Sequence, residues 1–215
     1  MFDTAAARRM MVDGQVRTAD VTNPDLIAAM LAVPRENFVP PALAGQAYSD
    51  GDLVVGDGRA LLKPMVLAKL IQAAQLDPGD HVLDVGCGTG YSSAVLSRIA
   101  GSVVALEEDA ALAERAKAAL SGAAGVTVVT ASLIAGWPAA APYDFILLNG
   151  ATEILPETIG LQLRPSGCLA CIFRGGPAAK AMLYRLVEGH LVGRPIFDAA
   201  AAVLPGFVAP PAFVF

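Results

Sequence analysis

The sequence predicts an α/β fold, with a mostly parallel β-sheet and helices on both of its faces. From residue 81 onward, short apolar runs alternate with helical patterns, which is the order that builds a parallel sheet. Each apolar run is nearly continuous, as expected for strands that are buried on both faces. The 215 residues are 55% hydrophobic and 16% charged, a balance that supports one large core and argues against disorder.

Residues 1–76 are expected to form an N-terminal helical lid segment that packs on a core of residues 77–215. Apolar side chains recur at helical spacing in residues 23–33, and Asn23 suits the N-cap of that helix. A second helix is expected from Pro64, and the turn sequence "DPGD" separates it from the core.

The core then alternates between strands and helices. Strands are expected at residues 81–86, 102–107, 126–131, 143–150 and 167–173, and helices at 89–100, 109–120 and 156–164. In sheets of this kind, ligands bind beyond the carboxyl ends of the strands, near the point where the strand order reverses. The loop after the first strand is therefore the expected binding site.

That loop belongs to the stretch "VLDVGCGTG", residues 82–90, with glycines at 86, 88 and 90. The third glycine comes one residue too early for a dinucleotide-binding loop, and Asp84 lies inside the strand. The pattern resembles motif I of the class I S-adenosylmethionine-dependent methyltransferases, whose fold is Rossmann-like. The resemblance implies that the methionine part of S-adenosylmethionine lies against a cofactor site made by Asp84, Gly86, Cys87, Gly88, Thr89 and Gly90.

The second strand ends in Glu107, where a carboxylate can accept hydrogen bonds from both ribose hydroxyls of a nucleoside. The alternative is an ordinary solvated acid at a strand end. Further along the chain, the resemblance places Ala131 and Ser132 near the adenine, where the family carries an acid. It also places Asn149 near the cofactor site.

Other segments narrow the resemblance to one family. "MVDGQVR" (11–17), "VPRENFVP" (33–40), "AYSD" (47–50) and residues 141–169 are similar to segments of the protein-L-isoaspartate O-methyltransferases. Membership implies an enzyme that methylates an isoaspartyl carboxylate in a damaged peptide or protein, with S-adenosyl-L-homocysteine as the second product. Such a carboxylate is already ionised at neutral pH, so the expected catalysis is orientation and exclusion of water.

The resemblance also implies a substrate lid in the loop "VGDGRALLKP", residues 55–64, where this chain departs from the family. Ala60 and Leu62 stand where the family has the Thr and Ser that position the substrate carboxylate. Arg59 or Lys63 is then expected to hold that carboxylate, unless these residues are only surface cations. Two alternatives stay open: a divergent relative with another acceptor, and a cofactor-binding protein without catalytic activity.

Two residues elsewhere bear on the nature of the acceptor. Arg174 follows the last predicted strand and is a further candidate to hold a carboxylate. Glu153 follows the fourth strand and would repel a carboxylate, which favours a neutral or cationic small acceptor.

Composition limits the expected partners. The net charge is −5 and no cluster of lysines and arginines occurs, so neither nucleic acid nor an anionic membrane surface is expected as a partner. Prolines interrupt the uncharged stretch 199–215, and the first residues lack a signal-peptide pattern, so a cytoplasmic location is expected. The same stretch either completes the core or forms an interface, and the oligomeric state stays open.

Cysteines and histidines give no metal or disulfide site. Cys168 and Cys171 lie in a predicted buried strand, where residues three apart face opposite sides of the sheet. His81 and His190 lack partners at ligand spacing, so both are expected to be structural. Trp137 is expected to pack beneath the loop after the third strand.

Overall fold

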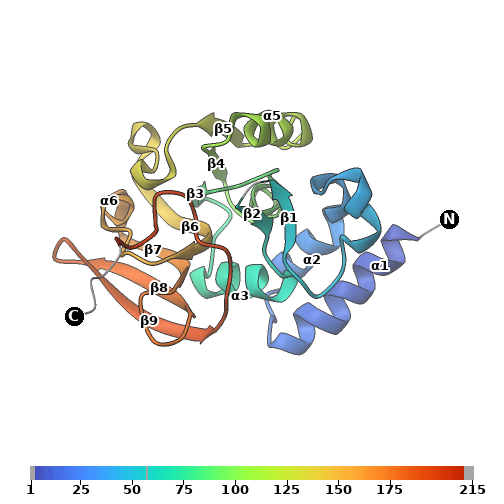
Figure 1. Ribbon diagram of the computed structural model, residues 1–215, viewed down its shortest axis with the longest axis horizontal. Helices are drawn as coiled ribbons and strands as arrows, with labels where there is room; N and C mark the ends of the chain where they lie inside the picture. Colours follow the sequence, from blue (N-terminus) through green and yellow to red (C-terminus); the bar gives the residue numbers. More distant parts are fainter. Residues whose placement is uncertain (1–2, 57, 211–215) are drawn as a thin grey trace.

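The computed structural model describes residues 3–56 and 58–210, and a seven-stranded sheet forms its centre. The strand order is β5-β4-β3-β6-β7-β8-β9 (Figure 1). Five strands are parallel: β3 (His81–Val85), β4 (Ser102–Glu107), β5 (Val126–Thr130), β6 (Tyr143–Thr152) and β7 (Leu163–Phe173). The antiparallel strands β8 (Lys180–Val187) and β9 (His190–Asp198) extend one edge. This mostly parallel sheet confirms the predicted fold class.

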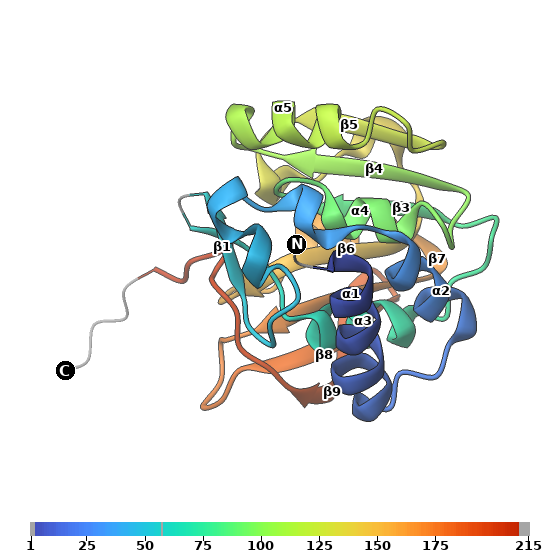
Figure 2. The same ribbon diagram turned by 90° about the vertical axis from the view of Figure 1, so that its right-hand side faces the viewer.

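Most of the helices pack on one face of the sheet, and this face is turned toward the viewer in Figure 2. They are α1 (Thr4–Met11), α2 (Pro24–Ala32), α3 (Pro64–Ala74), α4 (Tyr91–Leu96) and α5 (Ala110–Ala119). The side chain of Asn23 caps α2 by accepting the N–H of Leu26. The apolar sides of these helices and of the sheet form one large core cluster.

The opposite face has less helix. It is covered by the short α6 (Glu157–Gly160), two 3₁₀ turns and the segment that follows β9. The 3₁₀ turns are η5 (Leu133–Ala135) and η6 (Pro138–Ala140), and Trp137 packs between them, half-buried. The chain therefore closes the core on this side with loops as well as with helix.

Shorter elements connect α1 to the sheet. They are the π-helical turn η1 (Val12–Val16), the 3₁₀ turns η2 (Arg17–Ala19), η3 (Arg35–Phe38) and η4 (Pro41–Gln46), and the strands β1 (Leu53–Gly56) and β2 (Arg59–Leu61). β1 and β2 pair antiparallel outside the main sheet. Their hairpin spans most of the loop that was expected to be a substrate lid. The division of the chain at residues 76 and 77 stays a prediction. α3, which belongs to the N-terminal part, packs directly on β6, β7 and β8.

Two predicted helices end earlier than expected. The helix predicted over residues 156–164 is wrong after Gly160, because Leu163 already pairs with Tyr143 in the sheet. The helix predicted to run to residue 100 ends at Leu96. The predicted strand around the two cysteines is confirmed, and Cys168 and Cys171 join the core clusters on opposite faces of the sheet.

The segment after β9 crosses the carboxyl ends of β3 and β6 (Figure 1). The N–H of Ala151 donates to the carbonyl oxygen of Ala202, and the N–H of Leu204 donates to that of Ala151. The side chains of Leu204 and Phe207 are buried. As far as residue 210, the tail therefore completes the core, and its last residues lie outside the described part. Within that part, no helix combines the length and the apolar character needed to cross a bilayer.

Candidate active site

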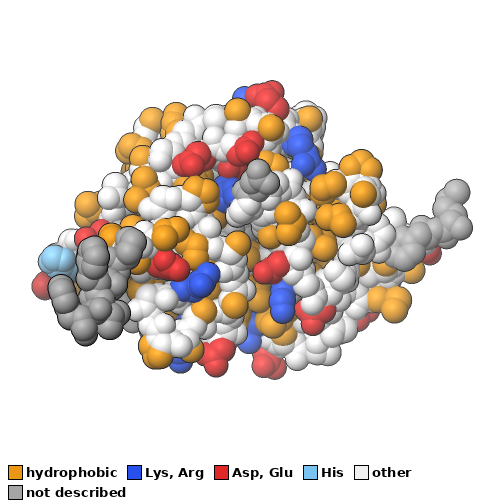
Figure 3. All heavy atoms as spheres, in the orientation of Figure 1, with side chains coloured by type: hydrophobic (Ala, Val, Ile, Leu, Met, Phe, Trp, Pro, Cys, Tyr) orange, Lys and Arg blue, Asp and Glu red, His pale blue; other side chains and the backbone are white. Residues whose placement is uncertain are grey.

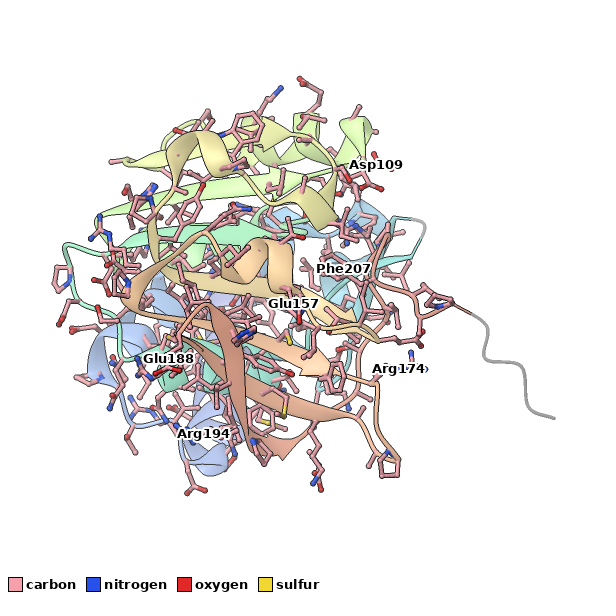
Figure 4. The ribbon with its side chains drawn as sticks, turned by 90° about the vertical axis from the view of Figure 1, so that its left-hand side faces the viewer. Asp109, Glu157, Arg174, Glu188, Arg194 and Phe207 are labelled. Atoms are coloured by element: carbon pink, nitrogen blue, oxygen red, sulfur yellow. The ribbon has the colours of Figure 1, made fainter. Side chains whose placement is uncertain are left out.

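The carboxyl ends of the parallel strands lie together at one end of the molecule, which faces the viewer in Figure 1. Figure 4 shows this arrangement from the side: Asp109 and Arg174, which follow β4 and β7, lie at the same end, while Glu188 and Arg194 lie at the other. Figure 3 shows acidic and basic side chains interspersed over that end.

Asp84 sits at the centre of a buried polar cluster at the end of β3. Its Oδ2 atom accepts hydrogen bonds of 2.6 Å from the hydroxyls of Ser92 and Ser93 at the start of α4. The Nδ2 atom of Asn149 in β6 donates to Ser92 Oγ, also at 2.6 Å. Among the described residues, the Oδ1 atoms of Asp84 and Asn149 have no hydrogen-bond partner. Burial, opposed by the two serine hydrogen bonds, raises the pKa of Asp84 to about 6.

The glycine loop follows this cluster and turns tightly against β4. Gly86 and Cys87 both donate their N–H groups to the carbonyl oxygen of Leu106. Gly90 has a φ of 95°, and a Cβ atom there would lie 2.7 Å from Leu120, the residue that caps the C-terminus of α5. A side chain at this position would therefore meet both backbone strain and a close contact.

Glu107 closes the opposite side of the loop. The residue is fully buried, so the interpretation as a solvated strand-end acid is wrong. Its Oε1 atom accepts the backbone N–H groups of Glu108 and Asp109, and Oε2 accepts the N–H of Gly88. Three backbone donors thus hold the carboxylate beside the glycine loop, where it faces the same space as Gly86 and Gly88.

Arg59 of β2 occupies that space. Its Nη2 atom lies 2.6 Å from each oxygen of Glu107, and the residue is 5% exposed, so it is not a surface cation. The guanidinium also covers Gly86, where a Cβ atom would lie 3.1 Å from Nη1. The side chain of Leu204 covers the same glycine from the tail. Sequence patterns could not reveal this pairing, because the two charges are 48 residues apart.

The other residues of the predicted lid take separate positions. Leu62 is buried, and its carbonyl oxygen accepts a hydrogen bond from Arg35. Ala60 and Leu62 both line the small cavity between the hairpin and the glycine loop. Lys63 is half-buried, its N–H donates to Asp52, and it lines a different hollow beside the segment after β9. Of the two candidate cations in the lid, Arg59 therefore faces the glycine loop and Lys63 lies away from it.

Arg174 and Glu153, the residues considered for the acceptor, lie near each other. Arg174 Nη2 is 3.9 Å from Glu153 Oε1, and Glu153 Oε2 accepts the N–H of Ala209. Figure 4 shows Arg174 at the outer rim of the strand ends. Because Glu153 has these partners, its charge is partly compensated, and the argument for a cationic acceptor is weaker.

The remaining residues predicted for the cofactor site lie in the glycine loop or after β5. Thr89 donates its hydroxyl to the carbonyl oxygen of Phe38, which ties the glycine loop to the helical segment. Cys87 is buried, and burial raises the pKa of its thiol well above the ordinary value. Ala131 and Ser132 follow β5, and the N–H of Ala131 donates to the carbonyl oxygen of Glu107. Ser132 is exposed at the start of η5.

Sequence reasoning missed Arg35, which is completely buried in η3. Its Nε and Nη2 atoms donate to the carbonyl oxygens of Ala47 and Leu62, each at 2.8 Å. Its guanidinium carbon lies 4.6 Å from the ring centroid of Tyr91, the first residue of α4. In the sequence, Arg35 stands between Pro34 and Glu36, which gives no sign of burial, and only the fold reveals what it contacts.

A mostly parallel sheet with a glycine loop after β3 and a buried carboxylate at the end of β4 defines a class I methyltransferase fold. Comparison with known proteins gives the family. The model of the protein-L-isoaspartate(D-aspartate) O-methyltransferase family matches residues 7–179, and the chain belongs to this family.

Relatives and solved structures agree with this assignment. A protein-L-isoaspartate O-methyltransferase of Methylorubrum extorquens is 45% identical over 188 residues, which cover 86% of this chain and 81% of the relative. One from Pelotomaculum thermopropionicum is 40% identical over 77% of this chain and 73% of its own. A solved protein-L-isoaspartate O-methyltransferase superposes with a TM-score of 0.80 at 26% identity, covering 93% of this chain and 66% of that one. A putative protein-L-isoaspartate O-methyltransferase of Plasmodium falciparum, solved with S-adenosyl-L-homocysteine, superposes with a TM-score of 0.77 at 16% identity. The superposition covers 95% of this chain and 99% of that one. At this low identity, the likeness supports the fold alone.

Proposed function

We propose that this chain transfers the methyl group of S-adenosylmethionine to an isoaspartyl carboxylate in damaged proteins or peptides. The observation that carries the proposal is the glycine loop between two buried carboxylates, Asp84 and Glu107, in a chain of this family. The cofactor supplies an electrophilic methyl group on a sulfonium centre. Everything else in the reaction depends on how this chain's residues hold the two partners.

The donor and acceptor atoms of the site fit the cofactor. The unpartnered Oδ1 atoms of Asp84 and Asn149 are acceptors suited to an ammonium group such as that of the methionine part. The carboxylate of Glu107 is suited to the two hydroxyls of a ribose. A Cβ atom at Gly88 would meet only Val55, at 3.7 Å, so the backbone of the loop is open to close approach on that side. The roles of these residues are proposals that rest on this complementarity.

The acceptor requires no general base. An isoaspartyl carboxyl group has an ordinary pKa of about 4, so it is already a nucleophile at neutral pH. The chain's task is to orient this carboxylate toward the methyl group and to exclude water. We propose that Arg59 provides the cation that holds it, because Ala60 and Leu62 offer no hydroxyl and Lys63 lies away from the glycine loop. A guanidinium suits this role, since it can bind both carboxylate oxygens.

A second candidate, methylation of a different acceptor, is favoured by one observation. Leu62 is 3% exposed and lies where the family positions its substrate through a hydroxyl. An apolar wall at that position would suit an acceptor that carries no carboxylate beside the reacting atom.

The test is methyl transfer from labelled S-adenosylmethionine to a short isoaspartyl peptide. The control is the same peptide with a normal aspartyl residue. We expect turnover of the isoaspartyl peptide only. Equal labelling of both peptides, or labelling of neither by protein that binds S-adenosyl-L-homocysteine, would favour the second candidate.

A further inference from the structure

We propose that Arg59 is an internal ligand of Glu107 which the cofactor must displace before it can bind. The inference rests on the proposed function, since it concerns the same cofactor site. It adds that the chain without cofactor is held in a closed state by its own side chain.

Glu107 has a limited number of acceptor positions, and Arg59 uses those that a ribose would need. A carboxylate has about four lone-pair positions for hydrogen bonds. In the structure, three backbone N–H groups take three of them, and the Nη2 atom of Arg59 lies 2.6 Å from both oxygens. Because the guanidinium bridges both oxygens, neither oxygen is open to a ribose hydroxyl while Arg59 stays there. The backbone donors are fixed by the glycine loop and by the turn after β4, so Arg59 is the donor that can leave.

Arg59 also fills the space between the hairpin and the glycine loop. Arg59, Leu62 and Leu204, with the glycine loop and residues 149–150, enclose only about 10 Å³ of free volume. That volume holds at most one water molecule. The ribose of a nucleoside therefore cannot reach Glu107 through this cavity while the guanidinium covers Gly86.

Displacement of Arg59 from Glu107 is feasible. A buried ion pair gains little net free energy, because desolvation of both charges offsets most of their attraction. Arg59 lies on the two-stranded β1–β2 hairpin, whose side chains Val55 and Leu61 are packed in the core. Exchange of the guanidinium for ribose hydroxyls thus needs only a rotation of the Arg59 side chain, while the hairpin stays in place.

Release of Arg59 also explains how one residue can serve two partners. While the guanidinium is bound to Glu107 it cannot hold a substrate carboxylate. Once the ribose takes Glu107, the same cation becomes available at the mouth of the site, beside Ala60 and Leu62. Binding of the acceptor therefore follows binding of the cofactor.

The experiment is calorimetric titration of S-adenosyl-L-homocysteine into the native chain, Arg59→Gln and Arg59→Lys. Arg115→Gln is the matched control, because Arg115 donates to the carbonyl oxygen of Val55 in the same hairpin and, within the described part of the chain, is not among the hydrogen-bond donors to Glu107. If the site is free in less than a tenth of native molecules, removing the competitor should lower the dissociation constant about tenfold or more. Arg59→Gln should show this gain, Arg59→Lys a smaller one, and Arg115→Gln a change of less than about threefold.

The rise in melting temperature at saturating S-adenosyl-L-homocysteine is measured alongside. It should be larger for Arg59→Gln than for the native chain, even if the unliganded variant is less stable. Equal or weaker binding by Arg59→Gln, in folded protein, would overturn the inference, since it would mean that Arg59 stays beside the cofactor. Binding without methyl transfer to the isoaspartyl peptide would reject the acceptor but leave this inference standing. No binding by either protein would overturn both.

Discussion

The Nη2 atom of Arg35 donates a hydrogen bond of 2.8 Å to the carbonyl oxygen of Leu62. A buried arginine from the helical segment thus holds the loop that faces the glycine loop. The same guanidinium lies over the ring of Tyr91 at the start of α4. Arg35 therefore links the helical segment, the predicted lid and the first helix after the glycine loop.

Replacing Arg35 with methionine should lower the free energy of unfolding by about 2–5 kcal/mol, because two buried carbonyl oxygens lose their donor. The exposed Arg98 offers a control, and Arg98→Met should change the unfolding free energy by less than about 0.5 kcal/mol. Urea denaturation measures both values. Equal stability of the two variants would mean that Arg35 does not hold the loop in place.

Two glycines of the loop should respond differently to alanine. At Gly90 the added Cβ atom would lie 2.7 Å from Leu120, so Gly90→Ala should lower the unfolding free energy by about 2–3 kcal/mol. At Gly88 the Cβ atom has room, and only the left-handed φ of 58° is unfavourable for alanine. Gly88→Ala should therefore lower the unfolding free energy by about 1–2 kcal/mol.

Binding should show the opposite order. The Cβ atom of Gly88→Ala would stand where the cofactor approaches the backbone, so this variant should lose more affinity for S-adenosyl-L-homocysteine than Gly90→Ala. Denaturation and calorimetry on the same preparations measure the two effects. Equal affinity of Gly88→Ala and the native chain would remove Gly88 from the proposed site.

The pH dependence of cofactor binding follows from Asp84. Burial raises its pKa from 3.8 to about 6, so the carboxyl group takes up a proton as the pH falls through 6. A protonated Asp84 attracts an ammonium group less than the carboxylate does. Affinity for S-adenosyl-L-homocysteine should therefore fall by up to about tenfold from pH 7.5 to pH 5, where about one molecule in ten keeps the charge. Asp84→Asn should bind weakly at both pH values, and a flat profile for the native chain would contradict this role.

Much of the fold could be predicted because its strands are buried. β3, β4, β6 and the second half of β7 are almost continuous apolar runs, and the glycine loop follows the first of them. β9 was missed because it is an edge strand with mostly exposed residues, which removes the apolar signal. The turn before β9 contains Glu188 and Gly189, both with positive φ. Glutamate is not typical of such a turn, so the sequence does not predict it.

The site shows the same division between local and distant information. Asp84, Glu107 and the glycines could be placed because each lies in or directly after a strand whose neighbours are known from the alternating pattern. The contacts of Arg35 and Arg59 could not, because both arginines act on groups far away in the sequence. Their surroundings also contain no repeated spacing that would indicate a buried charge.

Leu62→Ser tests how the lid compensates for the missing hydroxyl. The leucine is 3% exposed, and its truncation should lower the unfolding free energy by about 2–4 kcal/mol. The new hydroxyl should restore part of the methyl transfer that Arg59→Gln loses, so the double variant should be more active than Arg59→Gln alone. Initial rates with a saturating cofactor compare the two. If the serine gives no gain in that background, Leu62 does not stand where the substrate is held.

The most direct test of the account is the kcat/KM of methyl transfer to an isoaspartyl peptide, measured for the native chain and Arg59→Gln. The account predicts opposite directions for the two steps: Arg59→Gln should bind S-adenosyl-L-homocysteine more tightly, yet its kcat/KM for the peptide should fall by about tenfold or more, as expected when a charged hydrogen bond to the substrate is lost. An unchanged or higher kcat/KM in Arg59→Gln would contradict the claim that this arginine, once released from Glu107, holds the carboxylate to be methylated.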